Sequence, residues 1–136
     1  MKITLSKPLI IITLCSSLFA INISSCSTVP KEISEELTAQ ELIQKGQTEF
    51  EYGRYKASLA YYNTVCERYA DAPAFYLEAY YEIGHLYMKQ KKYEKAKAVF
   101  EDIMHIYADA QPGTLPGSFR KLSEGEMEKI KAKEGD

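Results

Sequence analysis

The chain repeats itself with a fixed spacing of 38 residues, and this repeat limits its fold more than any other feature. Tyr69-Ala70-Asp71-Ala72 recurs as Tyr107-Ala108-Asp109-Ala110. The same offset relates four further pairs: Gly46 and Gly84, Tyr55 and Tyr93, Tyr62 and Phe100, and Val65 and Ile103. Such matches in one register indicate two copies of a single supersecondary unit, which stack to bury a shared core.

Each copy has the pattern of a helical hairpin. In the second copy, residues spaced by three and four form one face of a helix: Tyr93, Ala96, Phe100, Ile103 and Tyr107. A two-residue break at Lys91-Lys92 separates this helix from the one before it. Gly84 lies in the middle of that earlier helix, where glycine costs about 1 kcal/mol relative to alanine. We therefore expect another backbone to approach Gly84 closely.

The second copy resembles a tetratricopeptide repeat. Its residues follow the order of that family, Tyr80-x2-Ile83-Gly84-x2-Tyr87 and then Ala96-x3-Phe100. The resemblance implies an all-α fold with two such hairpins over residues 38–110, in which Gly84 and Ala96 let paired helices approach. The first copy departs from the pattern at Lys45, Glu49 and Ser58. A terminal repeat is expected to be atypical, because one of its faces meets water.

A loop and a C-terminal capping helix are predicted for residues 111–136. Four apolar residues can share one face of a helix over residues 118–133: Phe119, Leu122, Met127 and Ile130. Such an amphipathic helix would close the end of the stack. Gly125 interrupts this pattern, so the alternative is a shorter helix capped by Ser123 and Glu126.

Residues 1–25 have the features of a lipoprotein signal peptide. Lys2 and Lys7 precede an uncharged apolar run, which is too short to span a bilayer comfortably. The sequence Ile23-Ser24-Ser25-Cys26 follows and resembles the lipobox of bacterial lipoproteins. This resemblance implies cleavage before Cys26, lipidation of Cys26, and a lipidated tether over residues 26–37. A buried segment that ends in cysteine by chance is disfavoured, because nothing in it alternates or repeats.

The composition and the few reactive side chains argue against several functions. A net charge of −2 and a pI of about 5.8 give no basic surface for nucleic acid. His85 and His105 stand in no nucleophile motif and in no metal-ligand spacing. Cys66 is predicted to be an inert, buried thiol. We therefore predict no enzymatic activity, no metal, no cofactor and no small-molecule substrate.

The expected partner is a protein. Tetratricopeptide repeats bind partners on the concave face formed by the first helix of each hairpin. The resemblance thus implies a partner-binding face with aromatic, aliphatic, polar and methionine side chains: Ile43, Gln47, Phe50, Glu51, Tyr81, His85, Met88 and Lys89. The alternative is that Ile43, Phe50 and Tyr81 pack between the two hairpins instead.

The lipobox and the long repeat together resemble BamD-type lipoproteins of outer-membrane β-barrel assembly. The repeat also resembles that of the periplasmic division coordinator of the Tol-Pal system. These resemblances imply a membrane-anchored scaffold, an accessory of barrel assembly with a barrel-assembly component as partner. The alternative is an envelope organiser that links the outer membrane to peptidoglycan or division proteins. Ser27 after Cys26 favours an anchor in the outer membrane, facing the periplasm. In a cell with a single membrane, the same signal predicts an anchor on the outer face of the cytoplasmic membrane.

Overall fold

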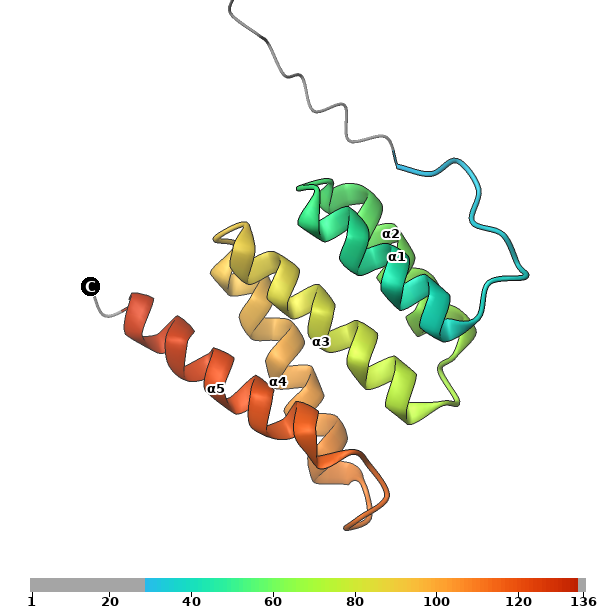
Figure 1. Ribbon diagram of the computed structural model, residues 1–136. Helices are drawn as coiled ribbons and strands as arrows, with labels where there is room; N and C mark the ends of the chain where they lie inside the picture. Colours follow the sequence, from blue (N-terminus) through green and yellow to red (C-terminus); the bar gives the residue numbers. More distant parts are fainter. Residues whose placement is uncertain (1–28, 135–136) are drawn as a thin grey trace, which may run out of the picture.

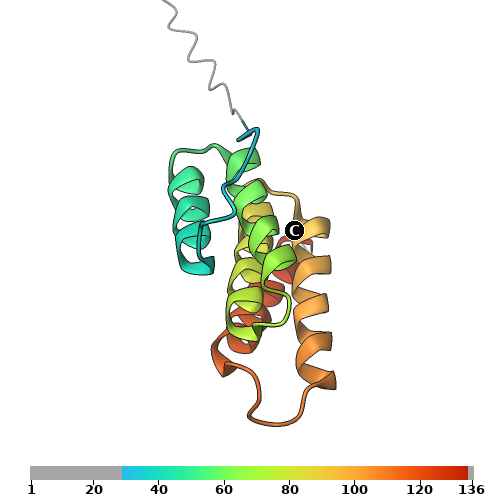
Figure 2. The same cartoon turned by 90° about the vertical axis from the view of Figure 1, so that its right-hand side faces the viewer.

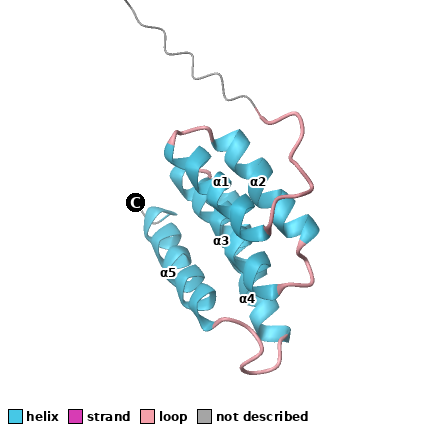
Figure 3. Cartoon of the chain, turned by 45° about the vertical axis from the view of Figure 1, so that its right-hand side comes forward, coloured by secondary structure: helices cyan, strands magenta, loops and turns pink. Residues whose placement is uncertain are grey.

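The computed structural model describes residues 29–134, and over these residues it is all-helical (Figure 3). Its helices are α1 (Ala39–Glu51), α2 (Tyr55–Arg68), α3 (Pro73–Lys89), α4 (Tyr93–Asp109) and α5 (Gly117–Glu134). The pairs α1–α2 and α3–α4 are the two predicted hairpins, and α5 is the predicted C-terminal helix. The predicted fold class is confirmed.

The helices form two layers. In Figure 1, α1, α3 and α5 lie on the near side, with α2 and α4 behind them. Each helix packs against the next one along the chain, and α5 contacts both α3 and α4 just as α3 contacts both α1 and α2 (Figure 2). Helix α5 therefore takes the place that the first helix of a third hairpin would occupy.

Local sequence signals explain where two of the helices begin. Thr38 caps α1 with a full capping box, in which its Oγ1 accepts from the backbone N–H of Glu41 while Glu41 accepts from the Thr38 N–H at 2.9 Å. The N–H and the hydroxyl of Thr38 both donate to the Glu41 carboxylate, and these two hydrogen bonds lower its pKa. Helix α3 begins with Pro73, whose fixed φ suits the first turn and whose missing N–H is not needed there. Both starts agree with the sequence pattern.

The turns inside the two hairpins have the same unusual backbone conformation. Gly53 has a φ of 70° and Lys91, 38 residues later, has a φ of 57°. This left-handed conformation is natural for glycine and unfavourable by about 1 kcal/mol or more for a residue with a Cβ. The second hairpin keeps the turn without the glycine, so packing of its helices holds the turn in shape.

A glycine and an aromatic ring pair at the centre of each hairpin. A Cβ added to Gly84 would lie 2.5 Å from the ring of Phe100, and a Cβ added to Gly46 would lie 2.5 Å from the ring of Tyr62. Both rings are fully buried. The expectation that a backbone approaches Gly84 is therefore wrong: the space left by the missing Cβ is filled by a ring from the second helix.

Helix α5 is continuous through Gly125, so the shorter, capped helix is wrong. Ser123 and Glu126 are buried, at 0% and 7% exposure, because their side of α5 packs against the second hairpin. Ile130 joins the core on the same side, while Leu122 stays 46% exposed. The amphipathic pattern was correct in outline, but it placed Leu122 on the wrong side of the helix.

The segment before α1 is held against the hairpins. The guanidinium of Arg68 donates to the carbonyl oxygens of Ser34 at 2.8 Å and Ile33 at 2.9 Å, and Tyr69 donates to that of Leu37 at 3.2 Å. Ile33 and Leu37 pack against the core. The described part of the expected tether, residues 29–37, is thus a docked segment. The predicted signal peptide and Cys26 lie outside the described residues.

Candidate partner-binding face

The predicted binding residues fall into three groups by exposure. Gln47, Glu51 and Lys89 are exposed. A second group is half-buried, and its apolar members pack against the core: Phe50, Tyr81, His85 and Met88. Ile43 is only 1% exposed and belongs to the core. It therefore packs inside the protein, as the alternative predicted, and is not available to a partner. We call the exposed and half-buried residues on this side of α1 and α3 the inner face.

Aromatic side chains connect the three helices of the near layer. The ring centroids of Phe50 on α1 and His85 on α3 are 5.6 Å apart, and Tyr81 stacks on His85 at 6.3 Å. Tyr81 also meets Phe119 of α5 at 5.9 Å and Phe100 of α4 at 5.8 Å. Such ring contacts stabilise the packing of the helices. The buried parts of these side chains therefore stabilise the packing of the helices, and their solvent-exposed parts belong to the inner face.

Two carboxylates stand one helical turn apart on the inner face. Burial raises the pKa values of Glu78 and Glu82, and in Glu82 the positive influence of His85 and a hydrogen bond from Gln47 act in the opposite direction. Among residues 29–134, neither carboxylate forms an ion pair with a lysine or arginine. Glu82 was not among the predicted residues, although its spacing from Glu78 and His85 places it on their side of α3.

Two buried polar atoms belong to residues that interact electrostatically with these carboxylates. The hydroxyl of Tyr62 and the Nδ1 atom of His85 are buried, and neither has a hydrogen-bond partner. Burial raises the pKa of Tyr62, and the next largest cause is the charge of Glu82, followed among carboxylates by Glu78 and Glu51. The Tyr62 side chain therefore extends from α2, past Gly46, toward the acidic part of the inner face.

The described residues offer binding surfaces and little reactive chemistry. Across residues 29–134, no three histidine, cysteine or acidic side chains gather in a way that could hold a metal. Burial raises the pKa of the Cys66 thiol to about 11, which keeps it protonated and unreactive near neutral pH. No helix in this part of the chain is long and apolar enough to cross a membrane.

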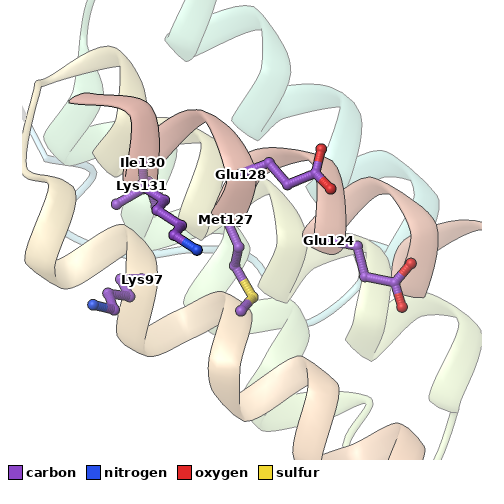
Figure 4. Close-up of a pocket in the computed structure, with 6 residues that line it drawn as sticks. All are labelled: Lys97, Glu124, Met127, Glu128, Ile130 and Lys131. Carbon is purple, nitrogen blue, oxygen red and sulfur yellow. The ribbon is translucent and has the colours of Figure 1, made fainter. Parts of the chain in front are cut away.

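A hollow of about 480 Å³ lies between α4 and α5 and is lined by Lys97, Glu124, Met127, Glu128, Ile130 and Lys131. Figure 4 shows Met127 pointing from α5 toward α4. The remaining side chains around it are mostly charged, as is usual at the solvated edge of a helix pair. None of the residues predicted to bind a partner lies here.

Comparison with known proteins identifies one of the two hairpins. Residues 77–108 match the tetratricopeptide repeat. The match runs from within α3 to within α4, so it covers the hairpin in which Gly84 receives the ring of Phe100. The first hairpin has the same pairing at Gly46 and Tyr62 and the same turn at Gly53, so its structure follows the repeat although its sequence is atypical.

The chain also has a longer relative. It is 26% identical, over 109 residues, to a protein of Treponema pallidum (strain Nichols) described only as an uncharacterized protein. The aligned region spans 79% of this chain and 44% of the length of the relative. No solved structure matches the chain significantly.

Proposed function

We propose that the protein is a membrane-anchored scaffold that binds a partner protein on its inner face. Tetratricopeptide repeats mediate protein–protein interaction, and an all-helical scaffold of this kind is typically not an enzyme. The observation that carries the proposal is the inner face itself. Exposed Gln47, Glu51 and Lys89 surround half-buried aromatic and methionine side chains, a combination suited to gripping a peptide segment.

The proposed anchor is a lipid on Cys26, supported by the lipobox-like Ile23-Ser24-Ser25-Cys26. A thioether-linked diacylglycerol together with an amide-linked acyl chain would hold the protein stably, since two chains anchor where one does not. Labelled palmitate should enter the wild-type protein in growing cells and should be absent from the Cys26→Ala protein. Equal labelling of both proteins would rule out this anchor.

The proposed role is that of a BamD-like accessory in outer-membrane β-barrel assembly, on the periplasmic side. It is supported by a lipobox combined with repeats of 38 residues, longer than the usual period of about 34. Only Ser27 and Thr28 separate Cys26 from the described residues, so a lipid on Cys26 would keep the hairpins close to the membrane.

Site-specific photo-crosslinking in intact cells tests this function. A crosslinker at Gln47 or Lys89 should capture a specific protein, because both side chains are exposed on the inner face. The matched controls are Asn63 and Glu67, which are equally classed as exposed but lie on α2. A β-barrel assembly protein among the captured species supports the proposed role, whereas a peptidoglycan or division protein favours the envelope organiser. Equal capture from both sets of positions would overturn the assignment of the inner face.

A further inference from the structure

Glu78 and Glu82 differ from the other partly buried acids of the described residues. Each of the latter has a basic partner: Glu49 pairs with Arg54, and Glu126 pairs with Lys129 at 2.7 Å. Glu78 and Glu82 lie at positions i and i+4 of α3, where like charges destabilise a helix, and neither has a lysine or arginine partner among the described residues. The free protein therefore keeps two half-buried carboxylates next to each other, and only His85 and the hydrogen bond from Gln47 offset the charge of Glu82.

From this arrangement we infer that the inner face takes a cationic segment of the partner, with a lysine or arginine side chain seated between Glu78 and Glu82. The inference rests on the proposed function, since it names the chemistry of the partner that the inner face would bind. A cation at this place supplies the missing counter-charge, and a charge-assisted hydrogen bond to a half-buried carboxylate is stronger than one in open water.

The surroundings of the two carboxylates fit such a side chain. The rings of Tyr81 and Phe50 both lie against His85, one helical turn from Glu82, and such rings can cover the aliphatic stem of a lysine or lie against a guanidinium. The buried hydroxyl of Tyr62 has Ser58 as a polar neighbour but makes no hydrogen bond of ordinary geometry, and it lies where the charges of Glu82 and Glu78 reach it. An acidic segment would instead meet Glu51, Glu78 and Glu82 with like charge.

The inference can be tested by selecting from a random library of 12-residue peptides on the purified full chain. Lysine and arginine should be enriched in the selected peptides, and the affinity of these peptides should fall with rising salt. The Glu78→Gln/Glu82→Gln protein should bind them roughly tenfold or more weakly. Its control is Glu124→Gln/Glu128→Gln, which removes the same charge from an i, i+4 pair on α5, away from the inner face. This control should bind the peptides as the wild type does.

The possible outcomes separate this inference from the proposed function. Selected peptides that are acidic or neutral, or that bind equally to both double variants, would overturn the cationic partner. If those peptides still protect the inner face from crosslinking at Gln47, the proposed function stands without it. Failure to select any peptide, together with no specific crosslink from the inner face, would count against both. A melting temperature of the Glu78→Gln/Glu82→Gln protein at or above that of the wild type excludes misfolding as the cause of weak binding.

Discussion

At the scale of single residues, the pairing of glycine with an aromatic ring explains how a large side chain can be buried at the centre of each hairpin. Gly46 faces Tyr62, and Gly84 faces Phe100, each with a ring atom 2.5 Å from where a Cβ would stand. The ring is buried inside the hairpin and cannot move aside without disturbing the core. The free energy lost by a glycine in mid-helix is offset by the burial of an entire aromatic side chain.

Gly84→Ala should destabilise the protein by about 1–3 kcal/mol, because the new methyl group overpacks against Phe100. The control is Gly125→Ala on α5, where an added Cβ has no atom within 4 Å. That change should stabilise the protein by about 0.5–1 kcal/mol through helix propensity alone. Urea unfolding of both proteins checks the prediction, and an unchanged midpoint for Gly84→Ala would contradict it.

The sequence indicated these residues correctly but not all of their neighbours. The register of 38 residues identified Gly46, Gly84, Tyr62 and Phe100 as equivalent pairs. The register could not show that a ring, rather than a backbone, occupies the space beside each glycine. Spacing along a helix does not tell how far a side chain of the neighbouring helix reaches. The burial of Ile43 was open for a similar reason, since a residue on the border between two helix faces is placed only by the neighbouring hairpin.

At the scale of elements, α5 and the docked segment close the two ends of the stack. Helix α5 covers α3 and α4 and brings Ile130 into the core. At the other end, residues 29–37 form neither a helix nor a strand. Their sequence therefore has no hydrophobic periodicity from which docking could be predicted. Only the partial burial of Ile33 and Leu37 and the hydrogen bonds of Arg68 reveal it.

Arg68→Ala should release the docked segment. Its guanidinium holds two backbone carbonyl groups and the carboxylate of Glu35, and the arginine side chain is only 22% exposed. We expect a loss of stability of about 1–2 kcal/mol and faster proteolytic cleavage before Leu37. The control is Arg120→Ala, which removes a single exposed ion pair with Glu124 and should change stability by less than about 1 kcal/mol. Cleavage at the same rate in both variants would show that Arg68 does not hold the segment.

At the scale of the whole molecule, the repeat pattern predicted the fold well and the functional surface only in outline. Two hairpins and a closing helix follow from helical periodicity, which local sequence fixes. The balance of charge on the inner face depends instead on which acids find a basic partner from another element. That is why Glu82 could not be singled out before its lack of an ion pair was known.

The unpaired acids also predict how stability depends on pH. The pKa values of Glu78 and Glu82 are raised in the folded state from an ordinary value of 4.5, so folding favours their protonated forms. Their effect on stability is therefore most favourable at low pH and is lost as the pH rises through the folded pKa values. The carboxyls of Glu41 and Glu49 have lowered pKa values and act in the opposite sense, but their contribution is lost only below about pH 4.5.

Protonation of Glu78 and Glu82 should therefore raise the melting temperature as the pH falls from about 7 to about 4.5, the ordinary pKa of a glutamate. The Glu78→Gln/Glu82→Gln protein lacks this contribution, so its melting temperature should rise less, or fall more, than that of the wild type over the same range. The Glu124→Gln/Glu128→Gln protein should follow the wild type, because it keeps both acids of the inner face. Calorimetry on the three proteins at both pH values makes the comparison. Parallel curves for all three would mean that the two acids are solvated as freely in the folded chain as in the unfolded one, which would also remove the reason for a cation to bind between them.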